Sequence, residues 1–208
     1  MIESIPISFR DYKIYRPEII LKMQREELVG IAEQASSLIE QLGGEHMFHP
    51  TKEELLAYLQ AGMACYAVDY TGKLGGFIKV DPWLYYPAGE PKTQQSIVDK
   101  LKSIDSGTAF LAVLETGSLV VDQKDQNNGL GTELKVQMSI QASTHFPGIP
   151  VIAVITNDNA PSIHNNKKLG WVHLDNGILR SFIGIDVLRD WDPPSTIFVY
   201  PKSIKAYH

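Results

Sequence analysis

Residues 115–131 combine the side chains and the spacing that are best suited to binding chemistry in this chain. Their strand-like part ends on three apolar residues, Leu119, Val120 and Val121. A polar loop containing Gly129 and Gly131 follows, and a helical pattern begins directly after it, at about Thr132. The first N–H groups of a helix lack partners and lie at the positive end of the helix dipole, so such a loop favours anions. The stretch therefore predicts a ligand that carries phosphate groups.

The spacing of the glycines selects among phosphate-binding loops. A dinucleotide loop needs a third glycine where Leu134 stands, and a nucleotide-binding P-loop needs a lysine where Thr132 follows Gly131. The pattern that fits is Gln126-x-x-Gly129-x-Gly131. It resembles the acetyl-CoA loop of the GNAT superfamily of N-acetyltransferases, which is usually written R/Q-x-x-G-x-G/A.

A second segment, residues 159–171, strengthens this resemblance. It follows a continuous apolar run at 151–155, which is typical of a strand buried on both faces. The segment is similar to the GNAT pattern N-x-x-A-[I/L]-x-x-Y-x-K-L-G-F. The residues that stand at its defined positions are Asn159, Ser162, Ile163, Asn166, Lys168, Leu169, Gly170 and Trp171. The specific resemblance thus covers residues 115–171, and the order of expected elements extends it to the whole chain at the level of fold.

The resemblance implies a fold and a co-substrate. The fold is mixed α/β, a strongly twisted central sheet with a splayed pair of parallel strands and flanking helices. Acetyl-CoA is the acetyl donor, and no metal is implied. In this family a bulge in the first strand of the pair starts the separation of the strands, and Gly117 is the candidate position here. The pantetheine arm of CoA forms hydrogen bonds with the strand backbone. A backbone N–H near Val120 or Val121 stabilises the oxyanion of the tetrahedral intermediate. The implied cofactor-binding residues are Leu119, Val120, Val121, Gln126, Asn127, Asn128, Gly129, Leu130, Gly131, Thr132, Asn159 and Asn166.

Glu115 is the candidate catalytic residue. A lysine-like amine has a pKa of ~10.4 and is mostly protonated at neutral pH, so a base must take its proton before it attacks the thioester. Glu115 precedes Gln126 at the spacing at which the histone-acetylating members of the family carry their base glutamate. The alternative interpretation is an ordinary exposed glutamate at a strand end.

The general acid is not evident from the sequence. Many family members carry a tyrosine at the position of Asn166, where it protonates the departing CoA thiolate. Asparagine cannot do this, and His164 would point to a different part of the helix. Either CoA leaves as a thiolate, since a thiol pKa of about 8.5 makes it a tolerable leaving group, or another residue or a water supplies the proton. Asn127 stands where glycine is frequent, and asparagine tolerates left-handed backbone.

The remaining segments predict the elements that position these residues. Strands are expected at 7–15, 65–69, 74–80, 109–114, 119–121, 151–155, from 170 and at 196–200, and helices at 28–42, 51–62, 94–104, from 132 and at 157–168. Residues 109–114 either form a hairpin with 119–121 or continue into them through an irregularity at Thr116 and Gly117. We expect one N-acetyltransferase-like domain over residues 1–208, with an insertion around 82–107 and a short C-terminal extension.

Composition excludes several classes of function. The apolar content of 44% and the charged content of 21% are those of an ordinary soluble globule, and the formal net charge of −5 argues against nucleic-acid binding. No apolar run is long enough to cross a membrane, and the N-terminus lacks the pattern of a secretory signal. Cys65 is the only cysteine, which favours a reducing compartment, and we expect a cytoplasmic protein.

The expected acceptor is a small-molecule or peptide amine, and the sequence leaves its identity and the oligomeric state open. His46, His49 and Glu45 lie in an expected loop without a further partner, so no metal site is expected. Two alternatives to an enzyme are kept. One is a CoA-binding sensor without catalysis, which Asn166 motivates, and the other is a scaffold that retains the fold for protein contacts.

Overall fold

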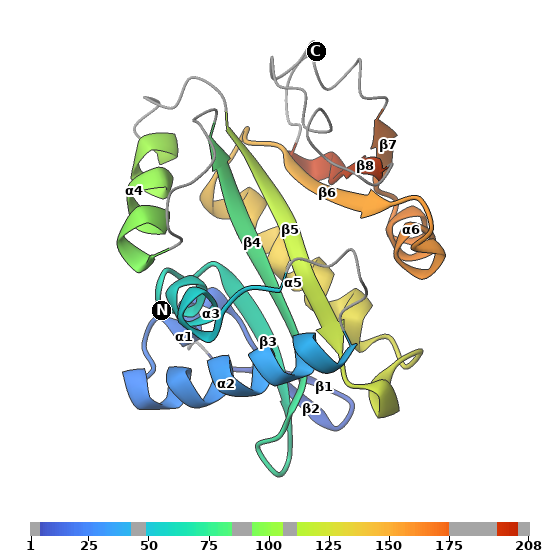
Figure 1. Ribbon diagram of the computed structural model, residues 1–208. Helices are drawn as coiled ribbons and strands as arrows, with labels where there is room; N and C mark the ends of the chain where they lie inside the picture. The colour runs from blue at the N-terminus through green and yellow to red at the C-terminus, as the bar shows by residue number, and fades with distance from the viewer. Residues whose placement is uncertain (1–4, 43–48, 85–92, 106–111, 175–194, 204–208) are drawn as a thin grey trace.

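The computed structural model describes residues 5–42, 49–84, 93–105, 112–174 and 195–203. Within these ranges, eight strands form one mixed sheet in the order β1-β2-β3-β4-β5-β6-β8-β7 (Figure 1). Neighbouring strands are antiparallel except β5 and β6, which are parallel. The strands are β1 (Ile7–Phe9), β2 (Tyr12–Tyr15), β3 (Ala64–Asp69), β4 (Leu74–Leu84), β5 (Ala112–Val121), β6 (Val151–Thr156), β7 (Val172–Leu174) and β8 (Ser195–Val199). The predicted mixed α/β class is confirmed.

Helices cover both faces of the sheet. The helices are α1 (Pro17–Ile20), α2 (Arg25–Leu42), α3 (Lys52–Gln60), α4 (Gln94–Asp105), α5 (Leu130–His145) and α6 (Ala160–Lys168). α2, α3 and α4 lie on one face, α5 packs behind β3, β4 and β5 on the other, and α6 lies beside β7 (Figure 1). We call the side covered by α2, α3 and α4 the front face and the side covered by α5 the back face.

The first long helices follow their sequence signals. In α2 the periodic apolar residues are buried against the sheet: Leu28, Ile31, Ala35 and Leu38. α3 begins with a capping box formed by Thr51 and, three residues later, Glu54. The Thr51 hydroxyl accepts the Glu54 amide at 3.2 Å, and the Glu54 carboxylate accepts the Thr51 amide at 2.8 Å. These signals are local, and they therefore fix where α3 begins without help from the rest of the chain.

The N-terminal strand expected at 7–15 is wrong in one respect, because the chain reverses and forms the hairpin β1–β2. Ile7 pairs with Ile14, and Phe9 pairs with Tyr12. Arg10 adopts a φ of 52°, the left-handed conformation that a tight turn needs. Side chains alternate on both sides of this turn, so the sequence pattern of a hairpin resembles that of one longer strand.

The apolar segments at 109–114 and 119–121 belong to one strand, β5, and not to a hairpin, although residues 109–111 lie outside the described residues. Pairing with β4 runs from Ala112 to Val121 with a single shift in register. The second of the two expectations for this segment, a continuous strand with an irregularity, is therefore the one confirmed.

Some expectations fall on parts of the chain that the structure does not describe. α4 confirms the helix expected at 94–104, whereas residues 85–92 and 106–107 of the expected insertion lie outside the described residues. The same holds for the proposed helix end at Gly43 and for the extension after 203. Among the described helices, none combines the length and the apolar character that crossing a membrane requires.

Candidate functional site

A bulge in β5 lies at the predicted place. Phe77 of β4 pairs with Val120, but Lys79 pairs with Gly117, so β5 has one residue more than β4 between these pairs. Ser118, inside this interval, has a φ of 49°. An extra residue bends its strand and increases the local twist. The bulge expected at Gly117 therefore lies directly after this glycine, at Ser118 and Leu119, because Gly117 itself is still paired with Lys79.

β5 and β6 separate just before the bulge. Their parallel pairing ends at Glu115, which lies opposite Ile152, and the Thr116 hydroxyl donates to the Ile152 carbonyl at 3.1 Å. Beyond this point β5 continues along β4 to Val121, whereas β6 diverges from it and pairs with β8 (Figure 1). The backbone of the second half of β5 is therefore not paired with β6.

The predicted phosphate loop folds back onto the end of β5. It starts with a 3-10 turn, η1 (Gln123–Asp125), after which the Gln126 side-chain amide donates to the Val121 carbonyl at 3.3 Å. The Asn128 side-chain oxygen accepts the Leu130 amide at 3.1 Å. These two bonds hold the loop in one shape between the strand and the start of α5.

Two loop residues adopt left-handed backbone conformations. Asn127 has a φ of 64°, and Gly129, the N-cap of α5, has a φ of 91°. Asn127 thus takes the conformation that its replacement of glycine requires, as expected. α5 begins at Leu130, two residues before the predicted start, so the amides of Gly131 and Thr132 lie in its first turn, where they lack intrahelical partners. This end of α5 is the anion-favouring element that the sequence predicts.

α5 lies close to β5 because Gly131 has no side chain. A Cβ atom at Gly131 would come within 3.1 Å of Val121 Cγ2 and within 3.9 Å of the Leu119 side chain. Behind the loop, Gly76 of β4 allows the same approach, since a Cβ there would lie 2.8 Å from Leu134 Cδ1. These two glycines therefore allow the start of α5 to lie close to the second half of β5, where β5 is no longer paired with β6.

α6 joins the site through a bond to α5. The Thr132 hydroxyl and the Asn165 side-chain oxygen lie 2.8 Å apart, which links the start of α5 to α6. Asn159, predicted to bind the cofactor, is the exposed N-cap of α6, and its side-chain oxygen accepts the Ser162 amide at 3.1 Å. Its position therefore has a structural reason of its own, helix capping.

Asn166 is fully buried, at the position where a tyrosine is frequent in the family. Its amide nitrogen donates to the Ser162 carbonyl at 2.7 Å, while its side-chain oxygen has no hydrogen-bond partner in the described part of the chain. His164 is exposed on another side of the same helix. The described residues of α6 thus contain no acid in the place of the tyrosine.

Lys135 is a buried cation that the sequence pattern did not single out. It lies on α5 with 4% of its surface exposed, and its ammonium stands 4.6 Å from the centre of the Trp171 ring. Burial lowers the pKa of Lys135 to about 7, and no charge on the described residues contributes to this change. The only signal in the sequence is a lysine next to Leu134 at an inward-facing helix position.

Glu115 lies on the front face among polar side chains. It is 8% exposed and pairs across the strands with Asp81, so both carboxylates project to the same side. The Lys79 ammonium contacts Asp81 at 3.2 Å and stands 4.5 Å from the centre of the Tyr58 ring. Glu115 is therefore a buried mid-strand residue and not the exposed strand-end glutamate of the alternative interpretation.

The charged residues of the loop mainly anchor it to the neighbouring hairpins. Lys124 lies 3.5 Å from Asp69 and 3.9 Å from Asp125. Burial, followed by a hydrogen bond with Asp125, raises the pKa of the Tyr12 hydroxyl. Lys124 therefore has carboxylate partners in this structure, and these account for its position in the loop.

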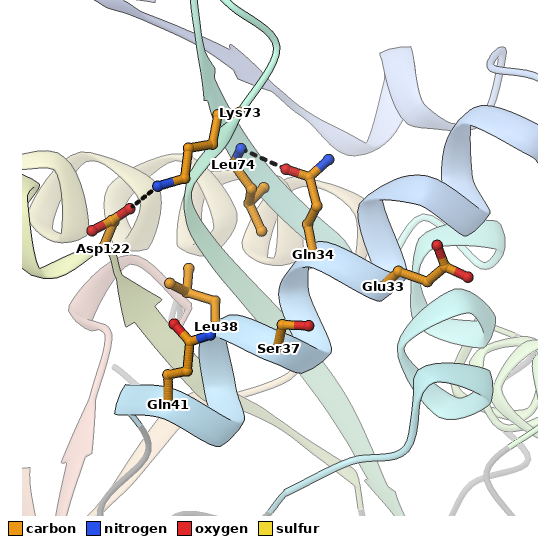
Figure 2. A pocket seen from close by; sticks show the side chains of 8 residues that line it. All are labelled: Glu33, Gln34, Ser37, Leu38, Gln41, Lys73, Leu74 and Asp122. Carbon is orange, nitrogen blue, oxygen red and sulfur yellow. Dashed lines mark hydrogen bonds and ion pairs between the residues drawn. The ribbon is translucent and has the colours of Figure 1, made fainter.

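An open pocket of about 280 Å³ lies between α2 and the start of β4, next to the loop (Figure 2). Lys73 and Asp122 form an ion pair of 2.9 Å at its edge, and Gln34 accepts the Leu74 amide at 2.9 Å. Of these residues only Asp122 adjoins the predicted loop, so the pocket is separate from the predicted CoA path.

The structure brings the predicted residues together around the second half of β5, the part that is paired with β4 but not with β6. Glu115, Leu119, Val120 and Val121 lie on this strand, residues 126–132 follow it, and α6 is bonded to Thr132. Sequence reasoning missed Tyr58, Lys79, Asp81 and Lys135. Where the structure describes the chain, no three His, Cys, Asp or Glu side chains gather as metal ligands, and Glu45 and His46 lie outside that part.

Known structures share this fold. A structure of agmatine N-acetyltransferase matches with a TM-score of 0.53 and 18% identity over 91% of this chain and 99% of that one. Arabidopsis thaliana NAA60 in complex with acetyl-CoA matches with a TM-score of 0.53 and 17% identity, over 81% and 92%. The mosquito protein arylalkylamine N-acetyltransferase like 5b matches with a TM-score of 0.51 and 19% identity, over 84% of this chain and 95% of that one.

The chain therefore has the fold of GNAT acetyltransferases, as residues 115–171 predict. The identities are low, and these likenesses concern the fold alone. No family profile matches the chain, and no curated protein sequence matches it significantly.

Proposed function

We propose that this protein transfers an acetyl group from acetyl-CoA to an amine by direct attack within a ternary complex. The observation that carries the proposal is the path of β5. The strand leaves β6 at Glu115, continues unpaired on that side to Val121, and leads through the loop into the start of α5. Acetyl transfer from CoA needs a base near the thioester and a phosphate-binding helix end farther along the cofactor. In the proposal, β5 carries the base and borders the thioester, and the loop after β5 leads to the helix end.

In the proposal, acetyl-CoA is held by backbone groups and by the helix end. Its pyrophosphate lies on the amides of residues 126–132, where the dipole of α5 favours negative charge. Its pantetheine arm runs along Leu119 and Val121, and the exposed Asn159 flanks it from α6, whereas the predicted contact of Asn166 would require its fully buried side chain to become exposed. The Val121 carbonyl now accepts the Gln126 side chain, so cofactor binding either adds to this bond or replaces it.

Glu115 acts as the base in the proposed reaction. It takes a proton from the acceptor ammonium, directly or through water, because an amine attacks only in its neutral form. The nitrogen then attacks the thioester carbon, and an amide near Val120 or Val121 stabilises the oxyanion. The attacking nitrogen loses its second proton to water, the C–S bond breaks, and CoA leaves as a thiolate, which a thiol pKa of about 8.5 permits without an acid at Asn166.

A CoA-binding sensor without catalysis is the second candidate. The fully buried Asn166 favours it, since the described residues of α6 offer no proton donor at this position. Both candidates predict binding. Acetyl-CoA at 100 times its Kd stabilises a protein by about 2.7 kcal/mol, so a rise in melting temperature is expected for either, and the scaffold alternative predicts none.

Release of free thiol separates enzyme from sensor. The protein is incubated with acetyl-CoA and a panel of polyamines, aminoglycosides, amino acids and peptides. The enzyme predicts amine-dependent thiol release, and the sensor predicts binding without release. Glu115→Gln should lower turnover at pH 7 while acetyl-CoA affinity stays nearly unchanged. Glu26→Gln, on the exposed first turn of α2, is the matched control. Equal turnover in Glu115→Gln and wild type would remove Glu115 from the base role.

A further inference from the structure

A buried polar group lies next to Glu115 and has no role in the reaction as proposed so far. It consists of Tyr58 from α3 and of Lys79 and Asp81 from β4, and we call it the front-face cluster. Asp81 pairs with Glu115, and Lys79 pairs with Gly117, so the cluster lies on the same side of the sheet as the proposed base. Burying polar side chains without full hydrogen bonding costs free energy, so the presence of this cluster beside Glu115 calls for a functional explanation.

Lys79 occupies space that a glycine leaves beside the bulge. A Cβ atom at Gly117 would lie 3.7 Å from the Lys79 ammonium. The lysine side chain is 5% exposed and that of Asp81 is 13% exposed, and the two are 3.2 Å apart. An ammonium has three N–H donors, and the contact with Asp81 engages one of them. The cation therefore stands where β5 leaves β6, at the side of the reacting centre.

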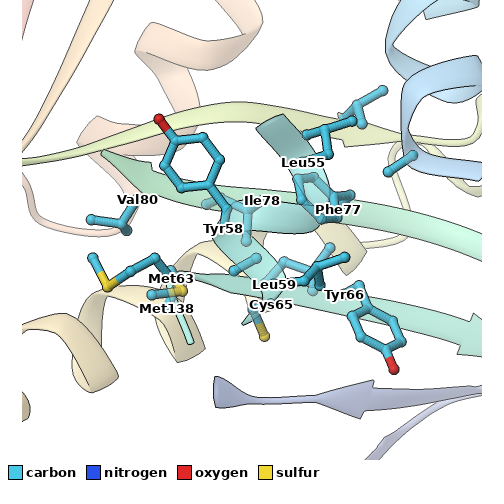
Figure 3. Packing of buried hydrophobic residues seen from close by; sticks show 14 of the residues in the cluster. Leu55, Tyr58, Leu59, Met63, Cys65, Tyr66, Phe77, Ile78, Val80 and Met138 are labelled. Carbon is cyan, nitrogen blue, oxygen red and sulfur yellow. The ribbon is translucent and has the colours of Figure 1, made fainter. Parts of the chain in front are cut away.

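The Tyr58 hydroxyl has no hydrogen-bond partner, although the residue is fully buried. Figure 3 shows this hydroxyl turned away from the surrounding hydrophobic side chains. Burial, the charge of Asp81 and the approach of the Tyr58 hydroxyl to the Asp81 carboxylate, which falls short of a hydrogen bond of ordinary geometry, raise the pKa of Tyr58, so the hydroxyl keeps its hydrogen at neutral pH. An unsatisfied buried hydroxyl costs free energy. A ligand oxygen that accepts this hydrogen would recover that free energy.

We propose that the front-face cluster binds a carbonyl or carboxylate oxygen close to the acceptor's amine. The acceptor is then an α-amino carbonyl compound, such as an amino acid, its amide or a peptide N-terminus. Tyr58 donates to this oxygen and Lys79 faces it, while Asp81 holds the ammonium of Lys79 and Glu115 takes the amine proton. This inference rests on the proposed acetyl transfer and names the substrate class of the same site.

A polyamine fits the front-face cluster less well. It brings N–H donors and positive charge but no acceptor oxygen, so the Tyr58 hydrogen stays unpaired. Its second ammonium also meets the buried cation of Lys79. The Asp81 carboxylate, 3.2 Å from the Lys79 ammonium, partly offsets the repulsion, so the missing acceptor oxygen is the larger penalty. The cluster therefore favours acceptors in which an oxygen replaces the second ammonium.

Matched acceptors test this inference. Phenylalanine amide and phenethylamine differ by the carboxamide, phenylalanine supplies a carboxylate, and cadaverine is a diamine without oxygen. For each, kcat/KM is measured by thiol release in wild type, Tyr58→Phe and Tyr66→Phe. Tyr66 is the control because it is a buried tyrosine whose hydroxyl has a partner of its own, the Met23 sulfur at 3.0 Å.

The expected result is a preference of about tenfold for phenylalanine amide or phenylalanine over phenethylamine, which corresponds to one good hydrogen bond. Tyr58→Phe should bring this ratio close to one, because the hydroxyl that donates to the acceptor oxygen is lost. Tyr66→Phe should keep the ratio. The inference is overturned if cadaverine or phenethylamine is preferred, or if Tyr58→Phe keeps the ratio. Acetyl-CoA binding without thiol release for any amine would overturn the proposed transfer itself, and this inference with it.

Discussion

Replacing Lys135 with methionine should stabilise the protein in a way that depends strongly on pH. Burial lowers the pKa of this ammonium from 10.5 to about 7. The unfolded chain therefore binds the proton more tightly than the folded one. The cost of Lys135 is full below pH 7, shrinks as the pH rises, and vanishes above 10.5. Methionine fills similar space without a charge, so Lys135→Met removes this cost.

The size of the effect follows from the two pKa values. A pKa difference of one corresponds to about 1.36 kcal/mol, so the cost of Lys135 is about 5 kcal/mol at pH 6 and about 1 kcal/mol at pH 9.5. The gain in the free energy of unfolding from Lys135→Met should thus be larger at pH 6 by roughly 3 to 4 kcal/mol. The other titratable groups contribute equally to the stability of wild type and of Lys135→Met, so their contributions cancel when the two proteins are compared at each pH.

Urea unfolding of wild type and Lys135→Met at pH 6 and pH 9.5 measures the difference directly. The control is Lys102→Met, which changes a lysine whose side chain is 72% exposed and should give the same small effect at both pH values. If the gain from Lys135→Met is equal at the two pH values, Lys135 has an ordinary pKa in the folded protein. In that case its burial beside Trp171 does not hold in solution.

Three further substitutions test the packing that positions the site. Thr132→Val removes the hydroxyl that is bonded to Asn165 and should lower the free energy of unfolding by about 1 kcal/mol, measured in urea. Gly76→Ala places a Cβ 2.8 Å from the Leu134 side chain and should destabilise by about 1–3 kcal/mol. Gly30→Ala, inside α2 with nothing within 4 Å of the new Cβ, should instead stabilise by about 0.5–1 kcal/mol. Equal melting temperatures for the two alanine variants would contradict the close approach of α5 to β4.

The parts that the sequence predicts well are those that depend on local chemistry. Asn127 adopts the left-handed conformation expected at a glycine-like position, and the bulge follows Gly117 directly. The capping box at Thr51 sets the start of α3. Each of these depends on a few neighbouring residues, so the pattern contains the physical cause.

The front-face cluster could not be predicted from the sequence, because it depends on pairing between distant segments. Lys79 and Asp81 alternate along a strand, which indicates a shared face. That this face also holds Glu115 follows only from the register of β4 against β5, which the bulge shifts by one residue. Tyr58 reaches the same cluster from α3, where its ring lies 4.5 Å from the Lys79 ammonium. A one-residue change in register would have placed the two carboxylates on opposite faces.

Binding of acetyl-CoA, measured by isothermal titration calorimetry, tests the central claim most directly. Gly129→Val puts a β-branched residue at a φ of 91° in the loop, and Gly72→Val puts one at a φ of 82° in the exposed β3–β4 turn, so both carry similar backbone strain. We expect one molecule of acetyl-CoA per chain in wild type, an affinity at least about tenfold lower in Gly129→Val, and wild-type binding in Gly72→Val. Absence of binding to wild type at millimolar acetyl-CoA, or equal affinity in all three proteins, would contradict the assignment of residues 126–132 as the cofactor loop.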